Sequence, residues 1–386
     1  MSQIAKNLLH DASNKSLSPL YSWIYLTSQL DRRDKISDEP FLCIEGDIYL
    51  SFAIINNSLD DPGLINLDDK ILLHSTVMDS FPGGKDFWSL GYILPKEYDS
   101  FLKGWKRTTD NKKRKAWILK ERSGYGSHGN TIVSTDEVNS IYCTSKVTEP
   151  ILCQRLIDPP MLIDGRKFSL RIYVVYFPGG NILSNDGEET IGAEIHISTE
   201  GLVKYASALF EDGETKSNTN ILDDQYMTNS GRGDGRTSQQ HDLKQLQRDF
   251  RRNGINYNHM WGRIERSIQI VMKRYIHLQN EESLDANAES SPGCAFANSK
   301  YPALCGIPKI LGFDYILDSS TNPFLLEINR FPGLEPRSSM DADVKHTVVY
   351  DAWVAASNRM GVPKEYFRRL RPINYKGFSL KTVPLS

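Results

Sequence analysis

The segment from Leu311 to Asn329, LGFDYILDSSTNPFLLEIN, constrains the fold of this chain more than any other part of the sequence. Two apolar runs flank the turn-rich stretch from Asp318 to Pro323, and that pattern predicts a β-hairpin. Aligning the two runs sets Leu317 opposite Phe324. The sequence therefore predicts two paired strands in which every side chain has a definite neighbour.

This register sets Asp314 opposite Glu327, and Asn329 shares the face of Glu327 because side chains alternate along a strand. Two carboxylates facing each other are destabilising unless a cation offsets them. Two carboxylates and an amide oxygen suit Mg²⁺ that carries the phosphates of a nucleotide. The alternative is a solvated polar face. It is disfavoured by apolar neighbours that indicate a packed hairpin: Phe313, Ile316, Leu326 and Ile328.

A second segment, from Asp164 to Tyr173, opens with a turn and continues with strict alternation. Lys167, Ser169 and Arg171 point one way, and the apolar residues between them point the other. An exposed amphipathic strand would give the same pattern. Two cations on one strand face would also form a clamp for phosphate oxygens.

A third segment joins Lys120, at the end of an apolar strand, to the glycine-rich stretch from Arg122 to Gly129. Backbone N–H groups in such a stretch approach phosphates closely. The stretch has neither the GxxxxGK[ST] form nor GxGxxG spacing, so it is no Walker loop or dinucleotide fingerprint. Taken alone, it is equally well explained as a plain turn.

The rest of the chain reads as alternating short elements. β-branched and aromatic content predicts extended segments, and helical periodicity predicts two helices, the longer one amphipathic. A polar loop is expected at 281–300. The expected extended segments are 40–44, 47–55, 91–95, 116–120, 150–157, 168–177, 194–198 and 201–205, and the expected helices are 96–105 and 257–279.

Length and charge limit the classes of protein. A chain of 386 residues exceeds the roughly 250–300 that one core supports, so two or three lobes are expected. A formal charge of -2 disfavours a nucleic-acid coat, and no membrane partner is expected. Five widely spaced cysteines without a CxxC pair indicate a reducing compartment. No signal peptide is visible, so a cytoplasmic, monomeric protein is expected, with association to the cytoskeleton or a cilium as a further expectation.

The order of these segments resembles the ATP-grasp fold and, more narrowly, the tubulin tyrosine ligase and ligase-like family. The resemblance covers roughly residues 80 to 355. It implies an α+β or α/β protein, an ATP-grasp fold with a small N-terminal mixed α/β lobe. The implied lobes are residues 1–105 (N-terminal), 106–180 (central), 181–360 (C-terminal) and a basic tail at 361–386. The matching pieces are Trp117–Lys120, Cys153–Leu156, Leu162–Arg171, Gly201–Lys204, Met227–Asn229, Gly312–Asp314 and Glu327–Asn329.

The resemblance also implies roles for single residues. Lys120 and Lys167 would contact the phosphates of ATP. Mg²⁺ would be held by Asp314, Glu327 and Asn329, and Glu327 would be catalytic. The other implied positions are Arg171 and Lys204 on the transferred phosphate and the acyl-phosphate intermediate, Gln154 with the backbone of Arg155 and Leu156 along the adenine, and Gly126, Ser169, Thr228 and Asn229 beside the nucleotide.

The implied activity is ATP-dependent ligation of a free amino acid (Tyr, Glu or Gly) to a protein carboxylate on an acidic tail such as that of tubulin, through an acyl phosphate. Two alternatives stay open: a ligase for a small molecule or a non-tubulin peptide, and an ATP-binding pseudoenzyme. The sequence departs from the common family form at five positions. Ser169 stands for Asp, Lys204 for Arg, Arg155 for Lys, Glu121 for Pro and His128 for Arg. Lysine for arginine keeps the charge but loses the bidentate fork.

Overall fold

A computed structural model gives the three-dimensional arrangement of most of the chain. It describes residues 64–78, 84–105, 115–122, 129–144, 149–184, 187–210, 228, 240–285, 308–334, 336–360 and 371–385. The predicted strands at 40–44 and 47–55 lie outside the described residues.

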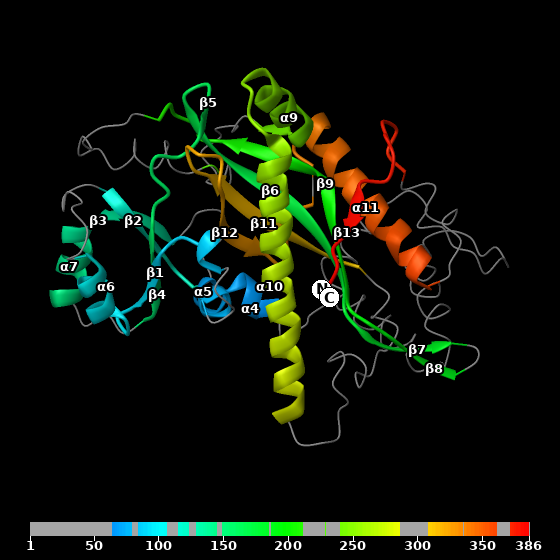
Figure 1. The fold of residues 1–386 in the computed structure, drawn as a ribbon, viewed down its shortest axis with the longest axis horizontal. Coiled ribbons are helices and arrows are strands. Elements are labelled where there is room, and N and C mark those ends of the chain that lie inside the picture. Colours follow the sequence, from blue (N-terminus) through cyan, green and yellow to red (C-terminus); the bar gives the residue numbers. More distant parts are fainter. Residues whose placement is uncertain are drawn as a thin grey trace, which may run out of the picture.

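A small antiparallel sheet stands at one end of the molecule (Figure 1). Its strand order is β1 (Gly91–Leu94), β4 (Ile151–Arg155), β2 (Lys115–Lys120) and β3 (Asn130–Ser134). Helices α6 (Tyr98–Trp105) and α7 (Thr135–Thr144) pack on it. The core between them is aromatic and aliphatic: Leu94, Phe101, Trp117, Leu119, Val133, Val138 and Cys153.

A larger antiparallel sheet forms the centre. Its main path is β10 (Gln240–Asp242), β9 (Glu194–Tyr205), β6 (Arg166–Phe177), β11 (Lys309–Leu317) and β12 (Pro323–Asn329). β13 (Leu380–Thr382) pairs with β9, and β5 (Leu162–Ile163) pairs with β6. β7 (Gly180–Ser184) and β8 (Gly187–Ile191) pair only with each other among the described strands.

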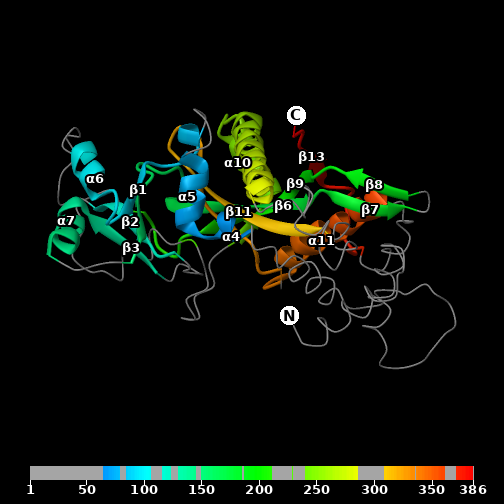
Figure 2. The same cartoon turned by 90° about the horizontal axis from the view of Figure 1, so that it is seen from below.

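Helices cover both faces of the larger sheet (Figure 2). α9 (Leu243–Arg252) and α10 (Tyr257–Asp285) lie on one face, and α11 (Ser339–Met360) lies on the other. The alternation predicted for β6 divides accordingly, because Leu170 and Ile172 join the core under α10, whereas Tyr173 and Val175 join the core under α11. Both faces of β6 are buried, which excludes an exposed amphipathic strand.

Two short helices link the sheets. α4 (Ile65–Asp68) and α5 (Lys70–Met78) precede a 3₁₀ turn at Gly84–Asp86. α5 packs against α10 and β4, and α4 packs against β12. The two helices therefore contact strands of both sheets.

The predicted elements within the described residues are confirmed, with two corrections. The strand and helix predictions at 91–95, 96–105, 116–120, 150–157, 168–177 and 194–205 correspond to β1, α6, β2, β4, β6 and β9. The predicted loop from Glu281 is wrong at its start, because α10 continues to Asp285. After Gly262 the first Gly or Pro is Pro292, so nothing in residues 281–285 stops the helix.

The second correction concerns the hairpin of β11 and β12. Asp314 is opposite Glu327 as predicted, but Leu317 is opposite Pro323 rather than Phe324. A bulge between Asp314 and Tyr315 accounts for the difference, because Leu326 is an extra residue in β12. The prediction was therefore correct at the carboxylates and wrong at the turn.

The architecture is mixed α/β, as expected, with antiparallel sheets. The predicted lobe boundaries stay predictions. Residues 380–382 of the predicted basic tail form β13 at the edge of β9. Within the described ranges, no helix is both long and apolar enough to cross a membrane.

We predict that Gly201→Ala destabilises the chain by about 1–3 kcal/mol, the usual cost of overpacking a core. A Cβ at this position would lie 2.6 Å from the carbonyl oxygen of Arg171 and 2.8 Å from Cδ1 of Leu243. Urea denaturation followed by circular dichroism measures the change.

Gly262→Ala is the matched control, because Gly262 is exposed within α10 and its Cβ would meet nothing within 4 Å. Replacing a helical glycine with alanine should stabilise the chain by about 0.5–1 kcal/mol. A Gly201→Ala chain as stable as the Gly262→Ala chain would contradict the close approach of β6 and β9.

Candidate active site

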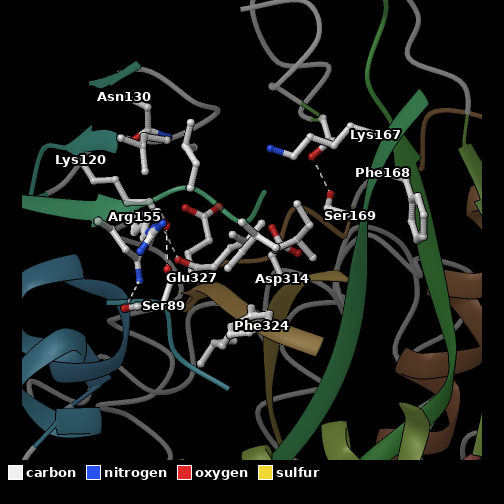
Figure 3. A pocket seen from close by; sticks show the side chains of 18 residues that line it. Ser89, Lys120, Asn130, Arg155, Lys167, Phe168, Ser169, Asp314, Phe324 and Glu327 are labelled. Carbon is white, nitrogen blue, oxygen red and sulfur yellow. Dashed lines mark hydrogen bonds between the residues drawn. The ribbon is translucent and has the colours of Figure 1, made fainter. Parts of the chain in front are cut away.

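A cleft lies between the small sheet and the larger one, and it encloses about 810 Å³ of empty space when its open mouth is included. Figure 3 shows Lys120 and Arg155 on one wall, Lys167 and Ser169 on the opposite wall, and the carboxylates between them. The lining residues are Ser89, Ile118, Lys120, Asn130, Gln154, Arg155, Leu156, Ile157, Lys167, Phe168, Ser169, Thr228, Asp314, Ile316 and Phe324 to Glu327.

Lys120 ends β2 and spans the cleft. Its ammonium donates to Gln154 Oε1 at 2.7 Å and to the carbonyl oxygen of Leu326 at 3.0 Å. Leu326 is the extra residue of the bulge, so the irregularity in β12 provides an acceptor for a lysine of the other sheet. Burial lowers the pKa of Lys120 to about 8, with Lys70 also lowering it and Glu327 opposing the shift.

The glycine-rich stretch follows Lys120. Its central residues 123–128, with Gly126 and His128, lie outside the described residues. At its ends the N–H of Glu121 donates to the carbonyl oxygen of Gly129 at 2.9 Å. Gly129 has a φ of 73°, and a Cβ there would lie 2.6 Å from Glu121 Oε2, so this end of the stretch requires glycine.

Lys167 and Ser169 project from β6 into the cleft, as their alternation predicts. Burial lowers the pKa of Lys167 to about 7; the charge of Lys120 adds to the shift and Asp158 opposes it. The hydroxyl of Ser169 lies 2.6 Å from the hydroxyl of Thr228, so two predicted nucleotide residues are brought together. Asn229, predicted beside them, lies outside the described residues.

Arg171 and Asp314 form a buried ion pair between β6 and β11. Arg171 Nη2 donates to Asp314 Oδ2 at 2.7 Å, and Arg171 Nε donates to Oδ1. Lys204 of β9 approaches the same carboxylate at 3.8 Å. Burial alone would raise the pKa of Asp314, but Arg171 and Lys204 hold it below its ordinary value. Burial lowers the pKa of Lys204 to about 8, with Arg171 adding to the shift and Asp314 opposing it.

Glu327 meets a cation that sequence reasoning missed. Lys70, the first residue of α5, is 5% exposed, and its ammonium lies 3.9 Å from Glu327 Oε2. Nothing in the run Asp68-Asp69-Lys70 distinguishes this lysine from a surface residue, because its burial depends on packing against strands that are far away in the sequence. The solvated polar face considered for the hairpin is excluded, since Asp314 is 4% exposed.

The residues present fit Mg²⁺. Asp314 and Glu327 are register partners, and Asn329 Nδ2 lies 3.4 Å from Asp314 Oδ2, so the three predicted ligands converge. All three offer hard oxygen donors. In the described part of the chain, no three His, Cys, Asp or Glu side chains gather as a metal cage. A Mg²⁺ ion here would therefore complete its coordination with water or phosphate oxygens.

The predicted adenine slot is also on the cleft wall, formed by Gln154, Arg155 and Leu156. Its backbone is well ordered by hydrogen bonds: the N–H of Arg155 donates to the carbonyl oxygen of Leu90 at 2.8 Å, and that of Leu156 donates to Ala116 at 2.9 Å. The carbonyl oxygen of Arg155 accepts from Ser89 at 2.7 Å. Gln154 is engaged by Lys120, so it orients the lysine as well as lining the wall.

Together these side chains form a cleft in which buried cations outnumber carboxylates. Burial disfavours the charged form of these lysines and lowers their pKa values to between about 7 and 8. A nearby anion would favour the charged form. Such a site is suited to bind a polyphosphate and to stabilise negative charge that develops during phosphoryl transfer.

Comparison with known proteins points the same way. The sequence pattern of the "Tubulin-tyrosine ligase family" matches residues 56–360. Tubulin polyglutamylase TTLL6 of Mus musculus is 27% identical over 306 residues, 76% of this chain and 33% of that protein. Tubulin polyglutamylase TTLL13 of Homo sapiens is 28% identical over 284 residues, 69% of this chain and 31% of that protein. Tubulin monoglutamylase TTLL4 of Mus musculus is 26% identical over 306 residues, 74% of this chain and 22% of that protein.

The chain spans a third or less of the length of these relatives. The family pattern covers both sheets except for the short strand β13, and it covers every side chain that lines the cleft. The mixed α/β architecture, with a cleft between two antiparallel sheets, is the ATP-grasp fold that the sequence predicts. The chain belongs to the tubulin-tyrosine ligase family.

Proposed function

We propose that this protein is an ATP-dependent ligase that joins a free amino acid to a carboxylate of an acidic protein tail, with tubulin as the acceptor. The observation that carries the proposal is a cleft lined by Lys120, Lys167, Asp314 and Glu327, with Arg171 and Lys204 behind it in contact with Asp314. Relatives named tubulin polyglutamylases and a monoglutamylase support glutamate as the first amino acid to test, before tyrosine and glycine.

The proposed reaction has two substitutions. An acceptor carboxylate oxygen attacks the terminal phosphorus of ATP, and the bond to the bridging oxygen breaks to release ADP. The amine of the amino acid then attacks the acyl carbon of the resulting acyl phosphate, loses a proton and releases phosphate. When bound, Mg²⁺ would supply a Lewis acid for the phosphate oxygens.

The chain's own residues have electrostatic roles in this scheme. Lys120 and Lys167 hold phosphate oxygens from opposite walls of the cleft. Arg171 and Lys204 stabilise negative charge on the transferred group, and Asp314, Glu327 and Asn329 hold the metal. Preorganised charges of this kind usually supply the largest part of catalysis in phosphoryl transfer, so no protein nucleophile is required.

Two other functions use the same cleft. A ligase for a small molecule or a non-tubulin peptide needs the same phosphate site but another acceptor. A pseudoenzyme would bind ATP without turnover, and Ser169 in place of the usual acid favours it. The intact set of Asp314, Glu327 and Asn329 disfavours the pseudoenzyme, because metal-dependent transfer is the step that a pseudoenzyme loses.

The three functions separate in one experiment. The protein is incubated with Mg-ATP, tubulin and radiolabelled glutamate, tyrosine or glycine in turn. Label on tubulin supports the proposed ligase. Release of ADP that needs an amino acid but no tubulin supports the small-molecule ligase, and nucleotide binding without turnover supports the pseudoenzyme.

We predict that Glu327→Gln lowers the ligation rate by roughly 100-fold or more, because a metal ligand and its charge are lost together. The substitution keeps the size of the side chain, so circular dichroism and the melting temperature should stay close to the wild type. Initial rates of label transfer at saturating ATP measure the effect.

Glu265→Gln is the control for loss of one acid, since Glu265 lies on α10 and contacts Trp261 and Lys381 rather than the cleft. Its rate should equal that of the wild type. A Glu327→Gln protein with the wild-type rate would rule out the metal assignment.

The lysines predict a pH dependence. Their pKa values lie near 7 for Lys167 and near 8 for Lys120 and Lys204, below the ordinary 10.5. Well below pH 7 all three are protonated, and the cost of burying their charge is fully present in the free chain; it is relieved as the pH rises through these pKa values. Phosphate favours the charged form, so binding of Mg-ATP should take up protons above pH 7.5 and weaken toward pH 9.

Isothermal titration at pH 8.5 in buffers of different ionisation enthalpy measures this proton uptake. Lys167→Met should reduce the number of protons taken up, whereas Lys381→Met, which alters an exposed lysine of β13, should leave it unchanged. A binding enthalpy that is the same in all buffers would contradict the prediction, because it would show that binding takes up no net protons.

A further inference from the structure

Three distant segments of the chain meet at one corner of the cleft. The residues Asp68, Asp69 and Lys70 join α4 to α5 and lie against the end of β2 and against β12. Each of the three side chains contacts a different residue of these strands or of the backbone that follows them. The corner belongs to neither sheet, and none of its contacts is implied by the strand pairing.

Asp69 holds the end of β2. Its Oδ1 accepts from the backbone N–H groups of Ile71 at 2.9 Å and Leu72 at 3.1 Å, which caps the start of α5. Its Oδ2 accepts from Nε of Arg122, two residues after Lys120. The backbone N–H of Lys70 also donates to the carbonyl oxygen of Arg122, at 3.4 Å. A single carboxylate therefore bonds both the first turn of α5 and the side chain of Arg122, which follows β2.

The neighbours of Asp69 hold β12. Lys70 places its ammonium 3.9 Å from Glu327 Oε2. Asp68 accepts from the backbone N–H of Arg330 at 3.4 Å, and its Oδ2 lies 3.8 Å from Nε of Arg330. The corner is thus tied to the strand that carries Glu327 at two points, one on each side of Asp69.

We propose that Asp69 is a positioning residue that, through its ion pair with Arg122, holds the start of α5, with Lys70 beside Glu327, against the chain that follows Lys120. This inference rests on the proposed function, because it concerns the phosphate end of the nucleotide site. Loss of the ion pair leaves α5 and β2 joined at this corner by the 3.4 Å backbone bond from Lys70 to Arg122. Lys70 and the chain beyond Lys120 are then held less firmly at this corner, and the site binds Mg-ATP less well.

The other explanation is that Asp69 acts only as a helix cap. A substitution that keeps the cap and removes the charge separates this explanation from a positioning role. Asn caps helices as well as Asp does, so Asp69→Asn keeps the cap and removes only the charge. Ion pairs that are open to water contribute little, and Arg122 is 51% exposed in its side chain, but Asp69 is only 8% exposed. The carboxylate is therefore held in one place by buried contacts, while the guanidinium reaches it from the surface.

The test is a double-mutant cycle on the full chain with Asp69→Asn, Arg122→Gln and the double variant. Affinity for Mg-ATP is measured by isothermal titration, and melting is followed by circular dichroism. Each single change should weaken binding by roughly 3- to 10-fold, and the double variant should be no weaker than either single one. Lys381→Gln, which breaks a similarly exposed ion pair with Glu265 far from the cleft, is the matched control and should bind as the wild type does.

Amide hydrogen exchange without nucleotide gives a second readout: exchange at residues 115–122 should rise in Asp69→Asn and Arg122→Gln. Unchanged affinity in both single variants, with the wild type binding Mg-ATP, would overturn the inference alone. Losses that add in the double variant would also overturn it, because independent effects exclude action through the pair. A wild type that binds no nucleotide would overturn the proposed function and the inference together.

Discussion

The ion pair between Arg171 and Asp314 is the centre of the charged side chains at the site, because Lys204 and Asn329 also approach Asp314. It is buried between two central strands of the larger sheet, and removal of one partner from such a pair typically costs about 3–5 kcal/mol. The pair needs space: a Cβ on Gly312 would lie 2.9 Å from Cδ of Arg171. The position of the Arg171 side chain therefore requires a glycine at position 312 of β11.

The departures from the common family form acquire a physical meaning around this pair. Lys204 reaches Asp314 at 3.8 Å as a single point charge, so Arg171 alone supplies the bidentate contact. Ser169 replaces a carboxylate and bonds instead with Thr228 at 2.6 Å. Relative to the common form, this part of the site lacks one carboxylate at position 169 and the bidentate fork at position 204. The two changes leave the Asp314–Glu327 pairing intact.

Sequence patterns predicted what depends on neighbours along a strand, and missed what depends on distant elements. The alternation of Lys167, Ser169 and Arg171 follows from the period of two, and it was correct. The bulge at Leu326 shifts the register of the hairpin by one residue. The carbonyl oxygen of Leu326 accepts a hydrogen bond from Lys120 of the other sheet, which the local sequence does not indicate. Lys70 carries no local signal at all, because only the packing of α4 and α5 against β12 and β4 brings it to Glu327.

The buried lysines explain why the cleft needs a strong scaffold. Each lysine held as a cation in this site opposes folding, as the lowered pKa values show, and neighbouring cations increase the cost. The opposing free energy comes from the two apolar cores on either face of the larger sheet, which lie under α10 and α11. A bound polyanion would relieve the repulsion without any change in those cores. The hydrophobic packing of the sheet therefore offsets the burial of these lysines, and a polyanion in the cleft would favour their charged form.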